Sequence, residues 1–154
     1  MFTIRPIELK DIEVIFNHTC QLAQRSGPKS PDFLLTKEKL INDLFGDFAD
    51  WHGLIIENKD KILGSCLYSF ANTNRAFNPT KCMFLDILFV DQQHRRKKLG
   101  KKLMDELKNI ALSKDITRIE FWCTKDNIES HEFYKTIGAE KINLLDVYNL
   151  NLSS

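Results

Sequence analysis

The sequence predicts a single α/β domain, on the grounds of its length, its composition and the order of its apolar patterns. The 154 residues suffice for one compact domain with its own core and leave no room for a second. Apolar residues make up 43% of the chain and charged residues 28%, which is typical of a globular protein. Segments with the two-residue period of strands alternate with segments of helical period, so we expect helices packed on a sheet.

The first third of the chain predicts a strand followed by two helices. Residues 2–5 (FTIR) favour a short strand. From Lys10 onward, one helical face carries Ile12, Ile15, Phe16, Leu22 and Ala23. Serine, glycine and proline residues between 26 and 31 break this pattern, and we expect Thr36 to cap a second helix. The inner face of the second helix consists of Leu40, Ile41, Leu44 and Phe45.

The middle of the chain predicts three strands and a helix. Residues 53–58 and 61–70 form an antiparallel hairpin around a polar turn. A polar loop at 71–80 leads to residues 81–90 (KCMFLDILFV), an apolar run long enough for a central strand. Residues 99–112 then place apolar side chains at helical spacing opposite a face of lysines.

The remaining segments predict a strand at 117–123, a helix at 130–138 that Gly138 ends, and a closing strand at 144–152. The total is six strands and four helices in one mixed α/β sandwich that spans residues 1–154. This architecture by itself specifies no function.

Charge and cysteine content exclude several classes of protein. The 22 Lys and Arg residues against 21 Asp and Glu give a formal net charge of +1, so we expect no nucleic-acid partner. The four cysteines have no zinc-ligand spacing, and we expect free thiols and no metal. No apolar run approaches the roughly 20 residues that cross a bilayer, and no secretory leader is evident. We therefore expect a cytoplasmic protein without a membrane partner.

The candidate anion site lies between the strand that ends at Val90 and the helix that begins near Leu99. Unpaired amides at a helix N-terminus favour a phosphate, so the backbone from Arg96 to Lys101 is expected to surround a pyrophosphate. Arg95, Arg96, Lys97 and Lys98 add positive charge there. On this loop alone, a solvated basic face is an equally good interpretation.

A second candidate segment carries Asn127, Ser130 and Tyr134, spaced three and four residues apart. A helix that begins at Asn127 would place the three on one side, facing a single ligand. The alternative is that Asn127 caps the helix and that Tyr134 is a core aromatic residue. The nearby phosphate loop favours the first interpretation.

Both segments resemble the GCN5-related N-acetyltransferase (GNAT) family. FLDILFVDQQHRRKKLGKKL is similar to its coenzyme A signature, in which Arg or Gln opens a glycine-punctuated turn; Arg95 and Gly100 match, while Arg96 and Lys98 replace glycines. FWCTKDNIESHEFYKTIGAE resembles its later Asn-to-Gly-Ala segment. Within the family, the chain looks closest to diamine and thialysine N-acetyltransferases. The resemblance implies a mixed, mostly antiparallel sheet of about six or seven strands flanked by about four helices.

The resemblance also implies roles for individual residues. Tyr134 is the expected acid that protonates the leaving thiolate, because a phenol with a pKa near 10 stays protonated at neutral pH. Asp86 stands where the diamine enzymes have a proton-relaying Glu. The expected contacts of acetyl-CoA are the backbone of Leu88, Phe89 and Val90, the loop and helix residues Arg95, Arg96, Lys97, Lys98, Leu99, Gly100 and Lys101, and the side chains of Asn127 and Ser130.

The activity implied is transfer of an acetyl group from acetyl-CoA to a primary amine of a small molecule, polyamine-like or amino-acid-like, by direct attack. The related enzymes are commonly homodimers, and the resemblance therefore implies a homodimer for this chain. Two further hypotheses remain open: a non-catalytic acyl-CoA sensor, and an acetyltransferase that acts on a protein amine.

Overall fold

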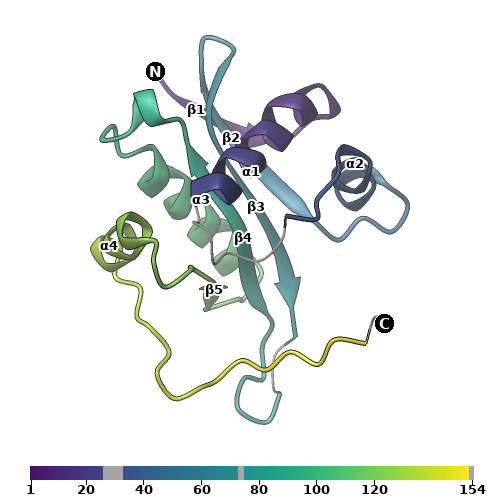
Figure 1. Ribbon diagram of the computed structural model, residues 1–154, viewed down its shortest axis with the longest axis vertical. Coiled ribbons are helices and arrows are strands. Elements are labelled where there is room, and N and C mark those ends of the chain that lie inside the picture. The colour runs from purple at the N-terminus through teal and green to yellow at the C-terminus, as the bar shows by residue number, and fades with distance from the viewer. Residues whose placement is uncertain (26–32, 73–74, 153–154) are drawn as a thin grey trace.

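The fold is a five-stranded sheet with helices on both faces (Figure 1). The computed structural model describes residues 1–25, 33–72 and 75–152. Strands β1 to β4 are antiparallel neighbours in chain order, and β5 lies parallel to β4 at the edge. The elements in chain order are β1 (Thr3–Pro6), α1 (Ile12–Arg25), α2 (Lys37–Phe45), β2 (His52–Asn58), β3 (Lys61–Ala71), β4 (Cys82–Val90), α3 (Leu99–Ser113), β5 (Ile119–Phe121) and α4 (Ile128–Thr136), with short 3-10 turns at Leu9–Asp11 and Gln92–His94.

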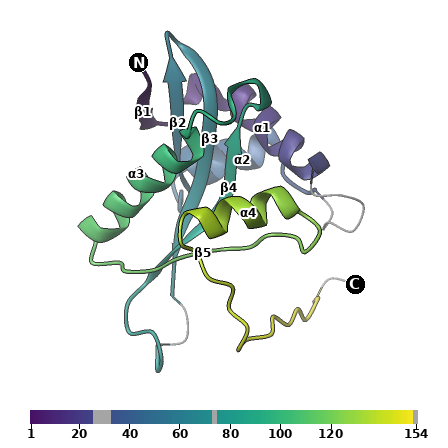
Figure 2. The same cartoon turned by 90° about the vertical axis from the view of Figure 1, so that its left-hand side faces the viewer.

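The helices divide the core into two clusters, one on each face of the sheet. Helices α1 and α2 cover one face, where buried Ile15, Leu40 and Ile55 meet. Helix α3 packs on the other face through Leu103 and Leu107, and residues of α4 join this second cluster. Figure 2 shows α3 and α4 in front of the strands, with α1 and α2 behind. Side chains along each strand point alternately to the two faces of the sheet, and apolar residues occur in both sets, so each face has its own core cluster.

Local chemistry explains where two of the helices begin and end. The Thr36 hydroxyl accepts a hydrogen bond from the Lys39 amide at 3.1 Å, which is the predicted cap of α2. At the end of α4, Gly138 has φ 85°, and the Ala139 amide donates to the Tyr134 carbonyl at 3.0 Å. This left-handed glycine ends the helix as the sequence predicted.

Strand β4 has a partner along its whole length on one side only. It pairs with β3 from Cys82 to Val90, with a bulge at Asp86, because Leu85 lies opposite Tyr68 whereas Ile87 lies opposite Leu67. On its other side it pairs with β5 only from Met83 to Leu85. The two strands therefore separate at the bulge, and the backbone beyond it is left without a strand partner on this side.

The predicted fold class is confirmed, but the strand count is lower than expected. The described residues form five strands, and the predicted closing strand at 144–152 is wrong. Its apolar side chains are exposed; Leu144, Tyr148 and Leu152 are at least 88% exposed. A strand needs a neighbour to pair its backbone, and this segment runs below β5, apart from the strands of the sheet (Figure 2). The predicted break at 26–31 lies outside the described residues.

No helix in the described ranges is long and apolar enough to cross a membrane.

A buried polar pair links α1 to the sheet beneath it. His18 Nδ1 lies 2.8 Å from Ser65 Oγ, and the imidazole stacks on Phe89 with a 4.2 Å centroid separation. His18 is 5% exposed, and burial lowers its pKa to about 4, against a smaller opposing effect of Asp91. The ring is therefore neutral at physiological pH.

This burial predicts an acid-dependent loss of stability. In the unfolded chain His18 takes up a proton near pH 6.5, whereas the folded protein resists protonation down to about pH 4. The unfolded state binds the proton first, so the free energy of unfolding falls between these values, by about 3 kcal/mol. Urea titrations between about pH 4 and pH 6.5 measure the free energy of unfolding at each pH. In His18→Gln the part of the pH dependence that comes from His18 is lost, since the other groups titrate alike in both proteins. An equal slope in the variant would refute the assignment.

Candidate active site

A cavity of about 1010 Å³ lies between β4 and α4. The end of α1, β4, the loop after it, the start of α3 and one side of α4 enclose it. Most of the predicted site residues line this cavity. They are Leu88, Val90, Arg95, Arg96, Lys98, Leu99, Gly100, Lys101, Asn127, Ser130 and Tyr134.

The N-terminus of α3 presents unpaired amides to the cavity. The first amide bond within the helix runs from Lys102 to the Lys98 carbonyl, at 3.0 Å. The amides of Leu99, Gly100 and Lys101 precede it and have no acceptor within the helix. No side chain caps this end. These donors, together with the positive end of the helix dipole, form a site for an anion such as a phosphate.

The loop before α3 adopts left-handed backbone at the two positions where the family pattern has glycine. Arg96 has φ 66° and Lys98 has φ 59° and ψ 24°. A side chain in this conformation costs about 1 kcal/mol. The loop thus keeps the backbone path of a glycine turn and adds two cationic side chains to the cavity wall.

We expect Lys98→Gly and Lys97→Gly to have different effects on stability. Glycine at 98 relieves the left-handed strain, which offsets the greater entropy that glycine gives the unfolded chain. Lys97 does not have a positive φ, so glycine there brings only the entropic loss, about 0.5–1 kcal/mol. Chemical denaturation measures both. An equal loss in the two variants would contradict the strain at Lys98.

The cationic side chains of the cavity face one acidic group. Arg25, Arg95, Arg96, Lys98 and Lys101 line the wall, and Glu129 of α4 is the acid among the lining residues. Arg95 Nη1 donates to Glu129 Oε1, which joins the loop to the first turn of α4. A phosphate that binds Arg95 must therefore share or replace this contact.

Asn127, the N-cap of α4, and Tyr134 within α4 both stabilise the local structure and line the cavity. Asn127 Oδ1 accepts from the Ser130 amide at 3.2 Å, so Asn127 caps a helix that begins at Ile128. Tyr134 packs on Phe121 with a 4.2 Å centroid separation, and its ring also borders the cavity. Burial, with a smaller effect of Cys123, raises the pKa of Tyr134 to about 12. The phenol is thus a proton donor at neutral pH.

Comparison with known proteins identifies the family. Residues 16–139 match the acetyltransferase (GNAT) family. The chain belongs to the GNAT family. It is accordingly an acetyl-CoA-dependent N-acetyltransferase.

Solved structures described as acetyltransferases share its fold. A possible acetyltransferase from Clostridium difficile 630 is 18% identical with a TM-score of 0.81, covering 100% of this chain and 99% of that one. A predicted acetyltransferase from Clostridium acetobutylicum with acetyl-CoA is 17% identical, with a TM-score of 0.76 and coverage of 97% and 96%. An aminoglycoside acetyltransferase from an uncultured soil sample, in complex with sisomicin, is 16% identical, with a TM-score of 0.73 and coverage of 97% of both chains.

Three predicted residues of the GNAT site do not line the cavity. Phe89 points to the face of the sheet that α1 covers, where it stacks on His18. Its neighbours Leu88 and Val90 point to the face that α3 covers, because side chains alternate along a strand. Lys97 is exposed on the loop. Asp86 lies at the bulge, where Trp51 Nε1 donates to its Oδ2 at 2.8 Å. Burial raises the pKa of Asp86, and the Trp51 bond opposes this.

The cavity also contains residues that sequence reasoning missed, namely Leu22, Arg25, Gln92, Glu129, Phe133, Thr136 and Ile137. The last four share helical spacing with Ser130 and Tyr134, so an extended face of α4 was detectable. Leu22 and Arg25 had no such signal, because only the tertiary packing of α1 brings them near β4.

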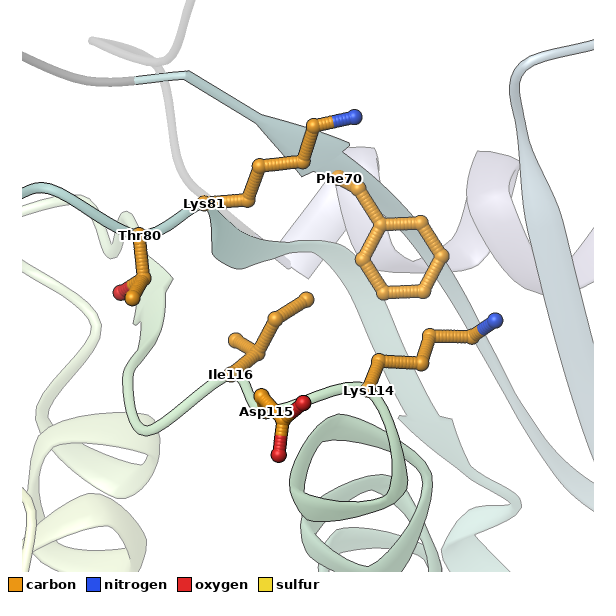
Figure 3. A pocket seen from close by; sticks show the side chains of 6 residues that line it. All are labelled: Phe70, Thr80, Lys81, Lys114, Asp115 and Ile116. Atoms are coloured by element: carbon orange, nitrogen blue, oxygen red, sulfur yellow. The ribbon is translucent and has the colours of Figure 1, made fainter.

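A smaller cavity of about 470 Å³ lies at the far end of α3 (Figure 3). Phe70, Lys114 and Ile116 line it together with Thr80, Lys81 and Asp115, and the Lys114 ammonium lies 5.5 Å from the centre of the Phe70 ring. It contains none of the predicted site residues. In the described ranges, no group of three or more His, Cys, Asp and Glu side chains is placed to hold a metal ion.

Proposed function

We propose that this enzyme acetylates the primary amine of a small molecule, which attacks acetyl-CoA directly. The observation that carries the proposal is the separation of β4 from β5, with a cationic cavity along β4 beyond the bulge and the Asp86 carboxylate at the bulge itself. The sisomicin complex of a protein with the same fold supports a small-molecule acceptor. All four cysteines are unpaired, which supports the cytoplasm as its compartment.

The donor would bind along two rows of backbone groups. The free amides of α3 and the cations beside them suit the pyrophosphate of coenzyme A. The backbone of β4 after the bulge has no strand neighbour on the β5 side, so the pantetheine arm can pair with it there as an added strand would. Leu88 and Val90 line the cavity at this edge.

The proposed reaction needs little more than positioning and two proton transfers. The amine nitrogen attacks the thioester carbonyl carbon, and the tetrahedral intermediate collapses with cleavage of the carbon–sulfur bond. Tyr134 gives its hydroxyl proton to the departing sulfur. The bound ammonium first loses a proton to water, and the neutral amine attacks. The extra proton that the nitrogen carries in the intermediate then leaves through Asp86 to water, and solvent restores the Tyr134 proton.

Replacing Tyr134 by Phe tests the acid. We expect kcat to fall about 10- to 100-fold, because general acid catalysis contributes at this level and a thiolate is a good leaving group. The affinity for acetyl-CoA should be unchanged, since the ring is kept. Coenzyme A release and isothermal titration measure the two quantities. Tyr148→Phe is the matched control, because Tyr148 is 90% exposed and far along the C-terminal segment.

Two outcomes would count against the proposal. An unchanged kcat in Tyr134→Phe would remove the assigned role of the phenol. Saturable acetyl-CoA binding without turnover on any amine would favour the acyl-CoA sensor, whereas turnover on protein amines alone would replace the small-molecule acceptor.

We further propose a homodimer in which residues 144–152 pair with a second copy. The segment has alternating apolar residues, of which Val147 is 77% and Leu150 84% exposed. Such a strand is stabilised only by a neighbour. Light scattering should show a dimer that Val147→Asp dissociates, while Leu112→Asp on the exposed side of α3 leaves it intact. A monomeric wild-type protein at all concentrations would disprove it.

A further inference from the structure

We propose that an aromatic and acidic surface next to the coenzyme A cavity selects primary amines carried on an apolar carbon skeleton, and rejects α-amino acids. Trp51, Phe84, Asp86 and Trp122 form this surface, which we call the amine surface. The inference rests on the proposed acetylation of a small amine and adds the class of its acceptor.

Strand geometry places these side chains on one face. Met83 and Leu85 point into the core under α3, so Phe84 between them points to the opposite face. The Trp122 ring meets Phe84 edge to face, with centroids 5.3 Å apart. Two residues beyond Phe84, the Asp86 carboxylate accepts the bond from Trp51, which packs against the α1–α2 core cluster.

The charge of this surface calls for a cation. Asp86 is partly desolvated yet open to solvent, and no Lys, Arg or His side chain in the described ranges forms an ion pair with it. Glu120, which lies opposite Phe84 on β5, is already bonded to Arg118 at 2.8 Å. The Asp86 carboxylate is therefore the anion available to an ammonium group.

The aromatic rings determine which kind of carbon skeleton the amine carries. Trp122 is 73% exposed, and the faces of indole rings bind both cations and hydrocarbon chains. The neighbouring cation, Arg118, is bonded to Glu120 and to Asn78, so it is not available for the carboxylate of an amino acid. A carboxylate beside the amine would instead meet Asp86 and be repelled.

The amine surface and the cavity meet at the point where β5 leaves β4. Asp86 is the bulged residue of β4, and Leu88 two positions further lines the coenzyme A cavity. An amine held at Asp86 thus lies beside the path of the thioester. The surface therefore serves the acceptor of this reaction.

A matched pair of amines tests the selection. 2-Phenylethylamine and phenylalanine differ only in the carboxylate, and we expect at least about a tenfold higher kcat/KM for the amine, since burying an unpaired charge near a like charge is costly. Trp122→Leu and Phe84→Leu should raise the KM for 2-phenylethylamine about 3- to 30-fold, the range of cation–π contacts, with kcat within about twofold. Phe77→Leu, an exposed aromatic residue of the β3–β4 loop, is the control.

Tryptophan fluorescence separates recognition from catalysis. The chain has two tryptophans, and both belong to the amine surface. Titration with 2-phenylethylamine, excited where the phenyl ring does not absorb, should give a saturable change that phenylalanine does not give. Equal effects of both compounds, or an unaltered KM in Trp122→Leu and Phe84→Leu, would overturn the inference. If no amine is acetylated, the proposed function fails, and the titration alone decides whether the surface recognises amines.

Discussion

The site depends on one structural constraint, the divergence of β5 from β4 after Leu85. Parallel pairing between the two strands covers Met83 to Leu85 and ends at the bulge. Each backbone amide or carbonyl beyond it needs another partner, because leaving such a group buried and unpaired costs about 1–3 kcal/mol. The fold thus leaves an unpaired strand edge beside the main cavity. Water or a ligand with amides of its own can satisfy that edge.

The second constraint is the close approach of α4 to the start of α3. A Cβ atom at Gly100 would lie 3.2 Å from Cζ of Phe133, so a side chain there would require the Phe133 ring to shift by a few tenths of an ångström. The Arg95–Glu129 pair joins the same two elements. Glycine is thus favoured at 100 by the close contact with Phe133, whereas at 96 and 98 it would be favoured for backbone conformation, and there Arg and Lys accept the strain.

Local sequence signals predicted the order of elements, the Thr36 cap, the Gly138 stop and most residues of the cavity wall, because helical spacing and loop charge are local properties. The bond from Trp51 to Asp86 joins residues 35 positions apart, and no local signal announces it. The error at 144–152 has the same origin. An alternating apolar segment specifies a strand only where a neighbouring strand accepts it.

The cavity and the amine surface carry opposite charge, and this bears on the order of the reaction. Arg25, Arg96 and Lys98 face the cavity, whereas Asp86 lies on the amine surface with Trp51. A polyanionic donor and a cationic acceptor therefore have separate approaches that meet at the bulge. In the proposed reaction both are bound together, and the amine reaches the thioester without an acyl-enzyme intermediate. The proposed direct transfer thus depends on where the strands separate.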